Sequence, residues 1–250
     1  MKKFFLMLVV ALPMFFMASC GDDNDDATLS LDQNTMSLDW SKTGQLTASE
    51  KNGVWTSTND FVASVDSKGV VTANHEGKAT IKYTKDGETA SCVVTVNTTN
   101  NYFTTITSWG ATSAQVKNAL KDSSLVLLEE DEDGDLMYTL TGNAYPWYGF
   151  LFQNGGLAGS SVYFPESIFD SEDFNGFIAQ RFVRIDTTDQ GVRYANANTL
   201  TEASEAVVVN YDTDLDVYVA TFVPVTHTKA DNDTDIFVKA KKLYRSAISK

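Results

Sequence analysis

The sequence has few of the residues on which metal and nucleophilic chemistry most often depend. Its 250 residues include two cysteines, two histidines and four prolines, against 33 acidic and 19 basic side chains. Two cysteines cannot supply an all-thiolate zinc site. The shortage of lysine and arginine leaves a net charge of -14, which argues against a nucleic-acid partner because phosphate binding depends on clustered cations. A hydrophobic content of 43% nevertheless indicates a folded globular chain.

The first segment carries the parts of a secretory signal. Two lysines precede an apolar run from Phe4 to Phe16, and small residues precede Cys20. The run is too short for a spanning helix, which needs about 20 apolar residues. The order Ala18-Ser19-Cys20 resembles the lipobox of bacterial lipoproteins, in which the chain is cleaved before a cysteine that is then lipidated. The resemblance implies a signal peptide at 1–19 and a lipid bilayer as partner through acylated Cys20; an ordinary signal peptide with a chance cysteine is the alternative.

An acidic tether is predicted at 20–27. Four aspartates stand close together after the cysteine: Asp22, Asp23, Asp25 and Asp26. Charges of one sign at this density repel one another and bury no apolar surface, so the stretch is expected to be solvated. It resembles the acidic export signal of Bacteroidota lipoproteins, which implies a lipid-anchored protein of the outer membrane at the cell surface. A plain spacer is the alternative for the aspartates, and a periplasm-facing lipoprotein is the alternative for the location.

Residues 28–98 alternate short apolar runs with turns rich in Asn, Asp and Gly, which predicts a β-sandwich. Four successive motifs resemble those of the bacterial Ig-like domain, group 2: Val54–Asn59, Val62–Asp66, Gly69–Ala73 and Gly77–Ile81. The resemblance implies an extracellular spacer or adhesion module, usually without catalysis.

Two residues of this module invite a structural interpretation. Trp55 is expected to be the core tryptophan of the sandwich, with ligand stacking as the alternative. Cys92 alternates with Val94 and Val96, which predicts a buried free thiol.

Residues 99–250 contain a pattern that occurs twice. Thr112-Ser113-Ala114-Gln115 can form a capping box, and Ser171 can cap a second helix. From Ser113 to the hairpin glycine Gly134 the distance is 21 residues, and from Ser171 to Gly191 it is 20. From that glycine to a closing proline the distances are 31 and 33 residues. We therefore expect two αβββ units, at about 108–165 and about 169–225, stacked into one α+β domain. Tandem units of this kind resemble an inhibitor-type architecture; two unrelated α+β halves are the alternative.

The C-terminal segment is the only basic stretch and allows two interpretations. A helix would place four apolar residues on one face: Phe237, Ala240, Tyr244 and Ile248. It would also allow an i,i+4 pair between Asp235 and Lys239. A strand over 236–243 is the alternative.

The sequence offers little catalytic chemistry. No phosphate loop, zinc-protease motif or nucleophile elbow occurs, and the histidines His75 and His227 lie in polar segments. Three Asp-x-Asp-x-Asp runs lack the Gly and Glu of a calcium-binding EF-hand. We therefore predict no catalytic residue, no metal site and no cofactor. Weak surface calcium binding and a small carboxylate-dependent hydrolase are the alternatives.

The densest aromatic run offers the candidate ligand-binding residues Tyr145, Trp147 and Tyr148. An exposed ring here would stack on a sugar or dock a partner, although full burial is the interpretation we favour.

The expected fold is mainly β, with an N-terminal Ig-like β-sandwich followed by an α+β domain of two αβββ units. The expected function is a non-catalytic cell-surface lipoprotein that binds a glycan or a protein. A proteinaceous inhibitor or envelope-assembly partner is the alternative.

Overall fold

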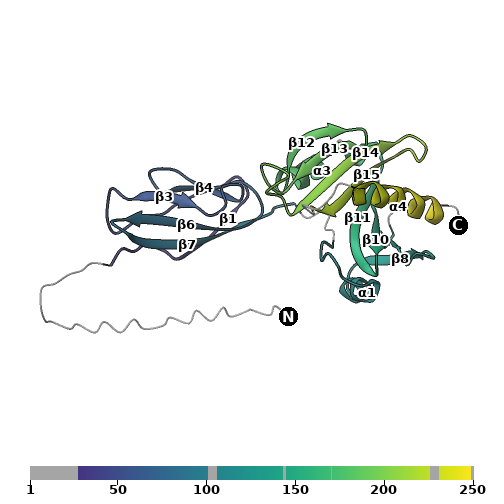
Figure 1. Cartoon of the computed structure of the whole chain (residues 1–250), viewed down its shortest axis with the longest axis horizontal. Helices are drawn as coiled ribbons and strands as arrows, with labels where there is room; N and C mark the ends of the chain where they lie inside the picture. Colours follow the sequence, from purple (N-terminus) through teal and green to yellow (C-terminus); the bar gives the residue numbers. More distant parts are fainter. Residues whose placement is uncertain (1–27, 101–105, 143–144, 170, 226–230, 249–250) are drawn as a thin grey trace, which may run out of the picture.

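A computed structural model describes residues 28–100, 106–142, 145–169, 171–225 and 231–248 (Figure 1). Figure 1 shows an all-strand domain carrying β1 to β7 beside a larger domain that ends in α4. The predicted signal peptide, lipidation site and export aspartates lie outside the described residues: Cys20, Asp22, Asp23, Asp25 and Asp26. Among the helices of the described residues, none combines the length and the apolar character that crossing a membrane requires.

The N-terminal domain is the predicted β-sandwich. Its strands are β1 Thr35–Asp39, β2 Thr43–Gln45, β3 Val54–Ser57, β4 Ala63–Val65, β5 Val70–Ala73, β6 Gly77–Lys85 and β7 Glu88–Asn97. One sheet has the order β1-β7-β6-β3 and the other β2-β5-β4. β1 pairs in parallel with β7, and the other pairs are antiparallel.

The core of this domain follows the period of two that the sequence shows. Cys92, Val94 and Val96 of β7 are all buried, which confirms the predicted buried thiol. Burial also raises the pKa of Cys92. Trp55, expected in the core, is instead half-buried at its edge, where its ring centre lies 4.6 Å from that of Tyr83.

The second domain is built on one antiparallel sheet of eight strands. They are β8 Leu125–Glu130, β9 Leu136–Leu140, β10 Trp147–Gln153, β11 Gly156–Phe164, β12 Val183–Thr188, β13 Gly191–Ala195, β14 Glu205–Asp212 and β15 Val217–Pro224. Their order is β12-β13-β14-β15-β11-β10-β9-β8. The helices of the domain are α1 Ser113–Leu120, α2 Glu166–Phe169, α3 Glu172–Ala179 and α4 Asp231–Ile248.

This strand order contains the predicted repeat but corrects the number of strands in each unit. Each half has a helix followed by four strands, and the halves meet where β11 pairs with β15. The expected αβββ unit is therefore wrong by one strand, because each unit forms two complete hairpins. The strands at the two ends of the sheet, β8 and β12, have side chains that are mostly exposed or half-buried.

One face of the sheet is covered by α1 and α3, and both begin with the caps that the sequence indicates. Thr112 and Gln115 form a reciprocal capping box at α1. Ser171 accepts a hydrogen bond of 3.1 Å from the backbone N–H of Phe174 at α3. The apolar residues of the two helices join one core cluster with the sheet: Val116, Leu120, Phe174, Phe177 and Ile178.

The other face is covered by α4, which confirms the helical interpretation of the C-terminal segment and excludes the strand. Ile236, Ala240, Leu243 and Tyr244 are buried against this face, whereas Phe237 is only half-buried. The approach is close, because a Cβ added to Gly159 of β11 would lie 2.5 Å from Cγ2 of Ile236.

Basic side chains of α4 bind the acidic turns of both repeat units. Lys239 Nζ lies 3.0 and 3.2 Å from the carboxylate oxygens of Asp135, which also accepts the backbone N–H of Phe152 at 2.7 Å. The remaining pairs are Lys242–Asp133 at 2.8 Å, Lys241–Asp212 at 2.9 Å and Arg245–Asp214 at 3.1 Å. The predicted partner of Lys239, Asp235, has its side chain outside the described part of the chain.

Burial separates these pairs, because the carboxylates of Asp135 and Asp212 are buried whereas those of Asp133 and Asp214 are not. Asp135 has a side chain only 1% exposed, and burial raises its pKa although Lys239 and Phe152 oppose the shift. We expect Lys239→Ala to lower the free energy of unfolding by about 3 kcal/mol, because it leaves this carboxylate buried without a cation. The matched control, Lys242→Ala, removes a lysine that is 61% exposed and should cost about 1 kcal/mol or less. Urea denaturation of both variants measures the difference; equal losses would contradict it.

Candidate functional site

The three candidate ligand-binding aromatic residues form no exposed surface, which agrees with the burial that the sequence favoured, fully for Tyr148 and in part for Tyr145 and Trp147. Tyr148 is 4% exposed and lies in the core beneath α1 and α3. Tyr145 and Trp147 are half-buried against α4, where the Tyr145 hydroxyl lies 2.9 Å from that of Tyr244 and the Trp147 ring centre lies 5.3 Å from the Tyr244 ring. Tyr145 and Trp147 therefore pack under α4, and Tyr148 packs under α1 and α3.

The acidic turn at Asp131, Asp133 and Asp135 brings carboxylate oxygens within 4.8 Å of one another. Such a group could hold a cation, but Lys239 and Lys242 already reach two of its three carboxylates. The carboxylates of this turn therefore form ion pairs with α4 in this structure.

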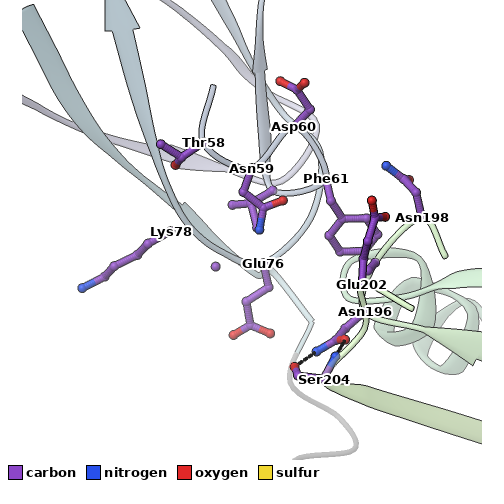
Figure 2. Close-up of a pocket in the computed structure, with 13 residues that line it drawn as sticks. Thr58, Asn59, Asp60, Phe61, Glu76, Lys78, Asn196, Asn198, Glu202 and Ser204 are labelled. Carbon is purple, nitrogen blue, oxygen red and sulfur yellow. Dashed lines mark hydrogen bonds between the residues drawn. The ribbon is translucent and has the colours of Figure 1, made fainter. Parts of the chain in front are cut away.

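A polar cavity lies where the two domains meet (Figure 2). Its volume is about 680 Å³. The lining comes from two turns of the Ig-like sandwich and from the loop between β13 and β14: Thr58, Asn59, Asp60, Phe61, Val62, Glu76, Gly77, Lys78, Asn196, Ala197, Asn198, Glu202 and Ser204. Figure 2 shows Asn59 and Glu76 on one side, with Asn196 and Glu202 on the other.

A second cavity of about 460 Å³ shares Asp60, Phe61 and Asn198 with the first and extends to Trp40. We call the two together the interdomain groove. Another cavity, of about 370 Å³, lies within the sandwich beside Trp55 and does not involve the second domain.

The sandwich side of the groove is held by a tight turn and a ring stack. The backbone carbonyl of Asn59 accepts hydrogen bonds from the N–H groups of Val62 at 3.1 Å and Ala63 at 3.0 Å. The Phe61 ring stacks on His75 with 3.9 Å between ring centres, and His75 Nδ1 lies 2.7 Å from the Phe61 carbonyl oxygen. His75 is thus half-buried, not a free surface residue, and burial lowers its pKa.

The opposite side is an ordered loop that differs between the two repeat units. Nine residues connect β13 to β14, whereas six connect β9 to β10 in the first unit. The side-chain carbonyl of Asn196 closes the longer loop by accepting the N–H groups of Ser204 and Glu205, each at 3.0 Å. Ala197 and Ala203 anchor it in a small buried cluster. The extra residues of the second unit therefore form one wall of the groove.

The end of α3 fixes the two domains relative to one another. Gln180 is 3% exposed; its side-chain carbonyl accepts the N–H groups of Thr99 at 2.8 Å and Asn100 at 3.2 Å. Its backbone carbonyl accepts the N–H of Glu76 at 2.8 Å. Arg181 Nε lies 2.7 Å from the Glu76 carboxylate, and its guanidinium also donates to the Asn100 carbonyl at 2.9 Å. We call these contacts the joint.

Glu205 is the titratable group most affected by this junction. Burial, with a smaller contribution from the negative charge of Glu76, raises its pKa to about 7. One carboxylate at the junction, Glu76, is therefore paired with Arg181, and a second, Glu205, has a pKa of about 7.

Several polar side chains in the groove have no intramolecular role. Within the described part of the chain, the side chains of Asn59, Asp60 and Asn198 make no hydrogen bond or ion pair. Amides both donate and accept hydrogen bonds, and carboxylates accept them. This combination can bind a ligand rich in hydroxyl or amide groups.

Comparison with known proteins identifies the first domain. Residues 27–102 match the family model described as bacterial Ig-like domain, group 2, which agrees with the resemblance carried by the motifs of residues 54–81. The N-terminal domain is therefore a bacterial Ig-like domain, and this suggests a surface-binding or recognition module. No curated protein matches the chain.

Sequence reasoning missed the residues of the groove. Trp40 stands in a turn and Asn198 in a loop, 158 positions apart, and tertiary contacts between the domains, the joint and the packing of Val183 on the sandwich core, bring them to one groove. The length difference between the two repeat loops was a usable signal, because added loop length is often functional.

The raised pKa of Glu205 predicts a pH-dependent stability. The unfolded chain releases this proton near the ordinary value of 4.5, whereas the folded chain retains it up to about 7. The folded state therefore binds more protons in this window, and stability falls as the pH rises through it. Between about pH 5 and pH 8, we expect the free energy of unfolding of the wild type to fall by about 1–3 kcal/mol more than that of Glu205→Gln. Urea titrations of both proteins across this range check it; parallel pH profiles would contradict it.

Proposed function

We propose that this chain is a non-catalytic, lipid-anchored cell-surface protein that recognises a glycan or a protein at the interdomain groove. The Ig-like domain supports the α+β domain and also contributes half of the binding surface. The observation that carries the proposal is the groove itself, in which unpaired amide and carboxylate side chains from both domains face one cavity in a fixed frame.

The proposed absence of catalysis rests on the groups that the groove provides. Its imidazole, His75, has one ring nitrogen against the Phe61 carbonyl and the ring itself stacked on Phe61. Its remaining titratable lining residues are Asp60, Glu76, Glu202 and Lys78. Glu76 is paired with Arg181, so this acid is committed to the joint.

The proposed location rests on the N-terminal segment of the sequence. Acylation of Cys20 would hold the chain in the outer membrane, and the acidic stretch Asp22, Asp23, Asp25 and Asp26 would direct it to the cell surface. Two acyl signals anchor a protein stably, whereas one chain alone binds a membrane weakly.

A second candidate function is protein binding by an inhibitor or envelope-assembly partner. It is favoured by the edge strand β8, where Val126, Leu127 and Leu128 are 47%, 41% and 43% exposed. An extended segment of another protein could add to this free edge, with main-chain hydrogen bonds for affinity and these side chains for specificity.

Intact cells that display the full chain test both candidates. We expect the cells to bind either a component of a glycan array or a purified envelope protein. Cys20→Ala should abolish this surface binding, because the chain is no longer anchored. Asn198→Arg, which places a large cation in the groove, should weaken binding about tenfold or more. The matched control Asn118→Arg, exposed on α1, should not.

The outcomes separate the candidates. Loss of binding in Leu127→Lys with full retention in Asn198→Arg would reject the groove and favour the β8 edge. Full binding by Cys20→Ala cells would reject the anchor.

A further inference from the structure

We propose that the interdomain groove binds a neutral oligosaccharide, with one sugar ring on Trp40 and hydroxyl groups bonded to Asn59 and Asn198. This inference rests on the proposed function and names the class of ligand at the same site.

Trp40 provides a fixed aromatic surface at one end of the groove. It follows the last residue of β1, and its backbone N–H donates to the Asn97 carbonyl at 2.9 Å. The next residues form a tight turn in which Ser41 has a φ of 63° and its N–H donates to Ala73 at 2.9 Å. The ring is half-buried, lines the 460 Å³ cavity and stacks on no other aromatic ring of the described chain. The apolar face of a pyranose can pack on such a ring.

The polar groups beyond Trp40 suit hydroxyl groups. Asn198 borders both cavities and Asn59 borders the larger one, and neither side chain has a partner in the described residues. An amide offers two donors and one acceptor oxygen, so it can bond two adjacent hydroxyls of a sugar, each of which donates and accepts. A site built to bond hydroxyl groups discriminates strongly against ligands that lack them.

The charge of the groove disfavours anionic ligands. Asp60, Glu76 and Glu202 line the larger cavity together with one base, Lys78. Of these acids, Glu76 is the one that has an ion-pair partner in the described residues, Arg181. A carboxylated or sulfated glycan would meet uncompensated negative charge, whereas a neutral glycan would donate hydroxyl protons to the same carboxylates.

The shape and composition of the groove favour a chain of sugars over an apolar molecule. The larger cavity alone, about 680 Å³, is within the range of small-ligand sites. The second cavity continues it past Asp60 and Phe61. Phe61 and Val62 are 6% exposed, so they give an apolar ligand little surface to contact.

The test is isothermal titration of the full chain in detergent with neutral tetrasaccharides of glucose, mannose, xylose and N-acetylglucosamine, and with a tetrasaccharide of galacturonic acid. At least one neutral probe should bind, and the affinity for the acidic probe should be lower by about tenfold or more. Trp40→Ala and Asn198→Ala should each weaken the neutral probe about tenfold, and Trp40→Phe should recover part of the loss. Glu202→Gln should reduce the difference in affinity between the neutral and the acidic probes. Asn118→Ala, and Trp55→Phe in the separate cavity, should bind as the wild type does.

Unchanged melting temperatures in these variants exclude misfolding as the cause. Tighter binding of the acidic probe, or neutral binding that Trp40→Ala and Asn198→Ala leave intact, would overturn the proposal. If no neutral probe binds while Asn198→Arg still abolishes ligand binding on cells, the sugar assignment fails and the proposed recognition function stands.

Discussion

The buried amide of Gln180 is the contact on which the arrangement of the two domains depends. Its side-chain carbonyl accepts the backbone N–H groups of Thr99 and Asn100 in the interdomain segment, and the backbone carbonyl of Gln180 accepts the N–H of Glu76. Gln180 is 3% exposed, and a buried polar group that loses its hydrogen-bond partners carries a full desolvation cost. Arg181 adds a charged contact at the same point. Without these bonds, the turns of the sandwich and the long loop of the second repeat unit would not form opposite walls of one groove.

The α+β domain has an excess of acidic side chains, and its last helix pairs with some of them. Residues 99–236 carry 21 acidic and six basic side chains, and five further bases follow Phe237. Those on α4 bind the acidic turns of both repeat units, so the helix neutralises the hairpins while it buries the second face of the sheet. The same helix covers the aromatic strand that an exposed ligand site would have needed. The sheet edge at β8 and the interdomain groove are therefore the two surfaces on which the proposed recognition rests.

The sequence predicted the parts of the fold that depend on neighbouring residues. The capping box at Thr112, the cap at Ser171 and the buried thiol of Cys92 follow from local spacing and period, and they are confirmed. The repeat was found from the spacing of glycines and prolines, but each unit has four strands in place of the expected three, because this spacing marks the length of a unit and not the number of strands within it. The groove could not be predicted, since Trp40 and Asn198 line one cavity through tertiary contacts between the domains, among them those of Gln180, Arg181 and Val183. The partner of Lys239 was also missed, because Asp135 is distant in sequence and close in space.

Gln180 holds the two domains in one fixed arrangement, and amide hydrogen exchange tests this role most directly. In the full chain, Gln180→Ala should speed the exchange of the Thr99 and Asn100 amides by about tenfold or more, as expected for a loss of roughly 1–3 kcal/mol. Amides inside the sheets of both domains should keep their protection. Gln153→Ala, a glutamine whose side chain makes no hydrogen bond within the described residues, is the matched control and should leave both amides unchanged. Exchange at Thr99 and Asn100 that is equally slow in the wild type and in Gln180→Ala would contradict the claim.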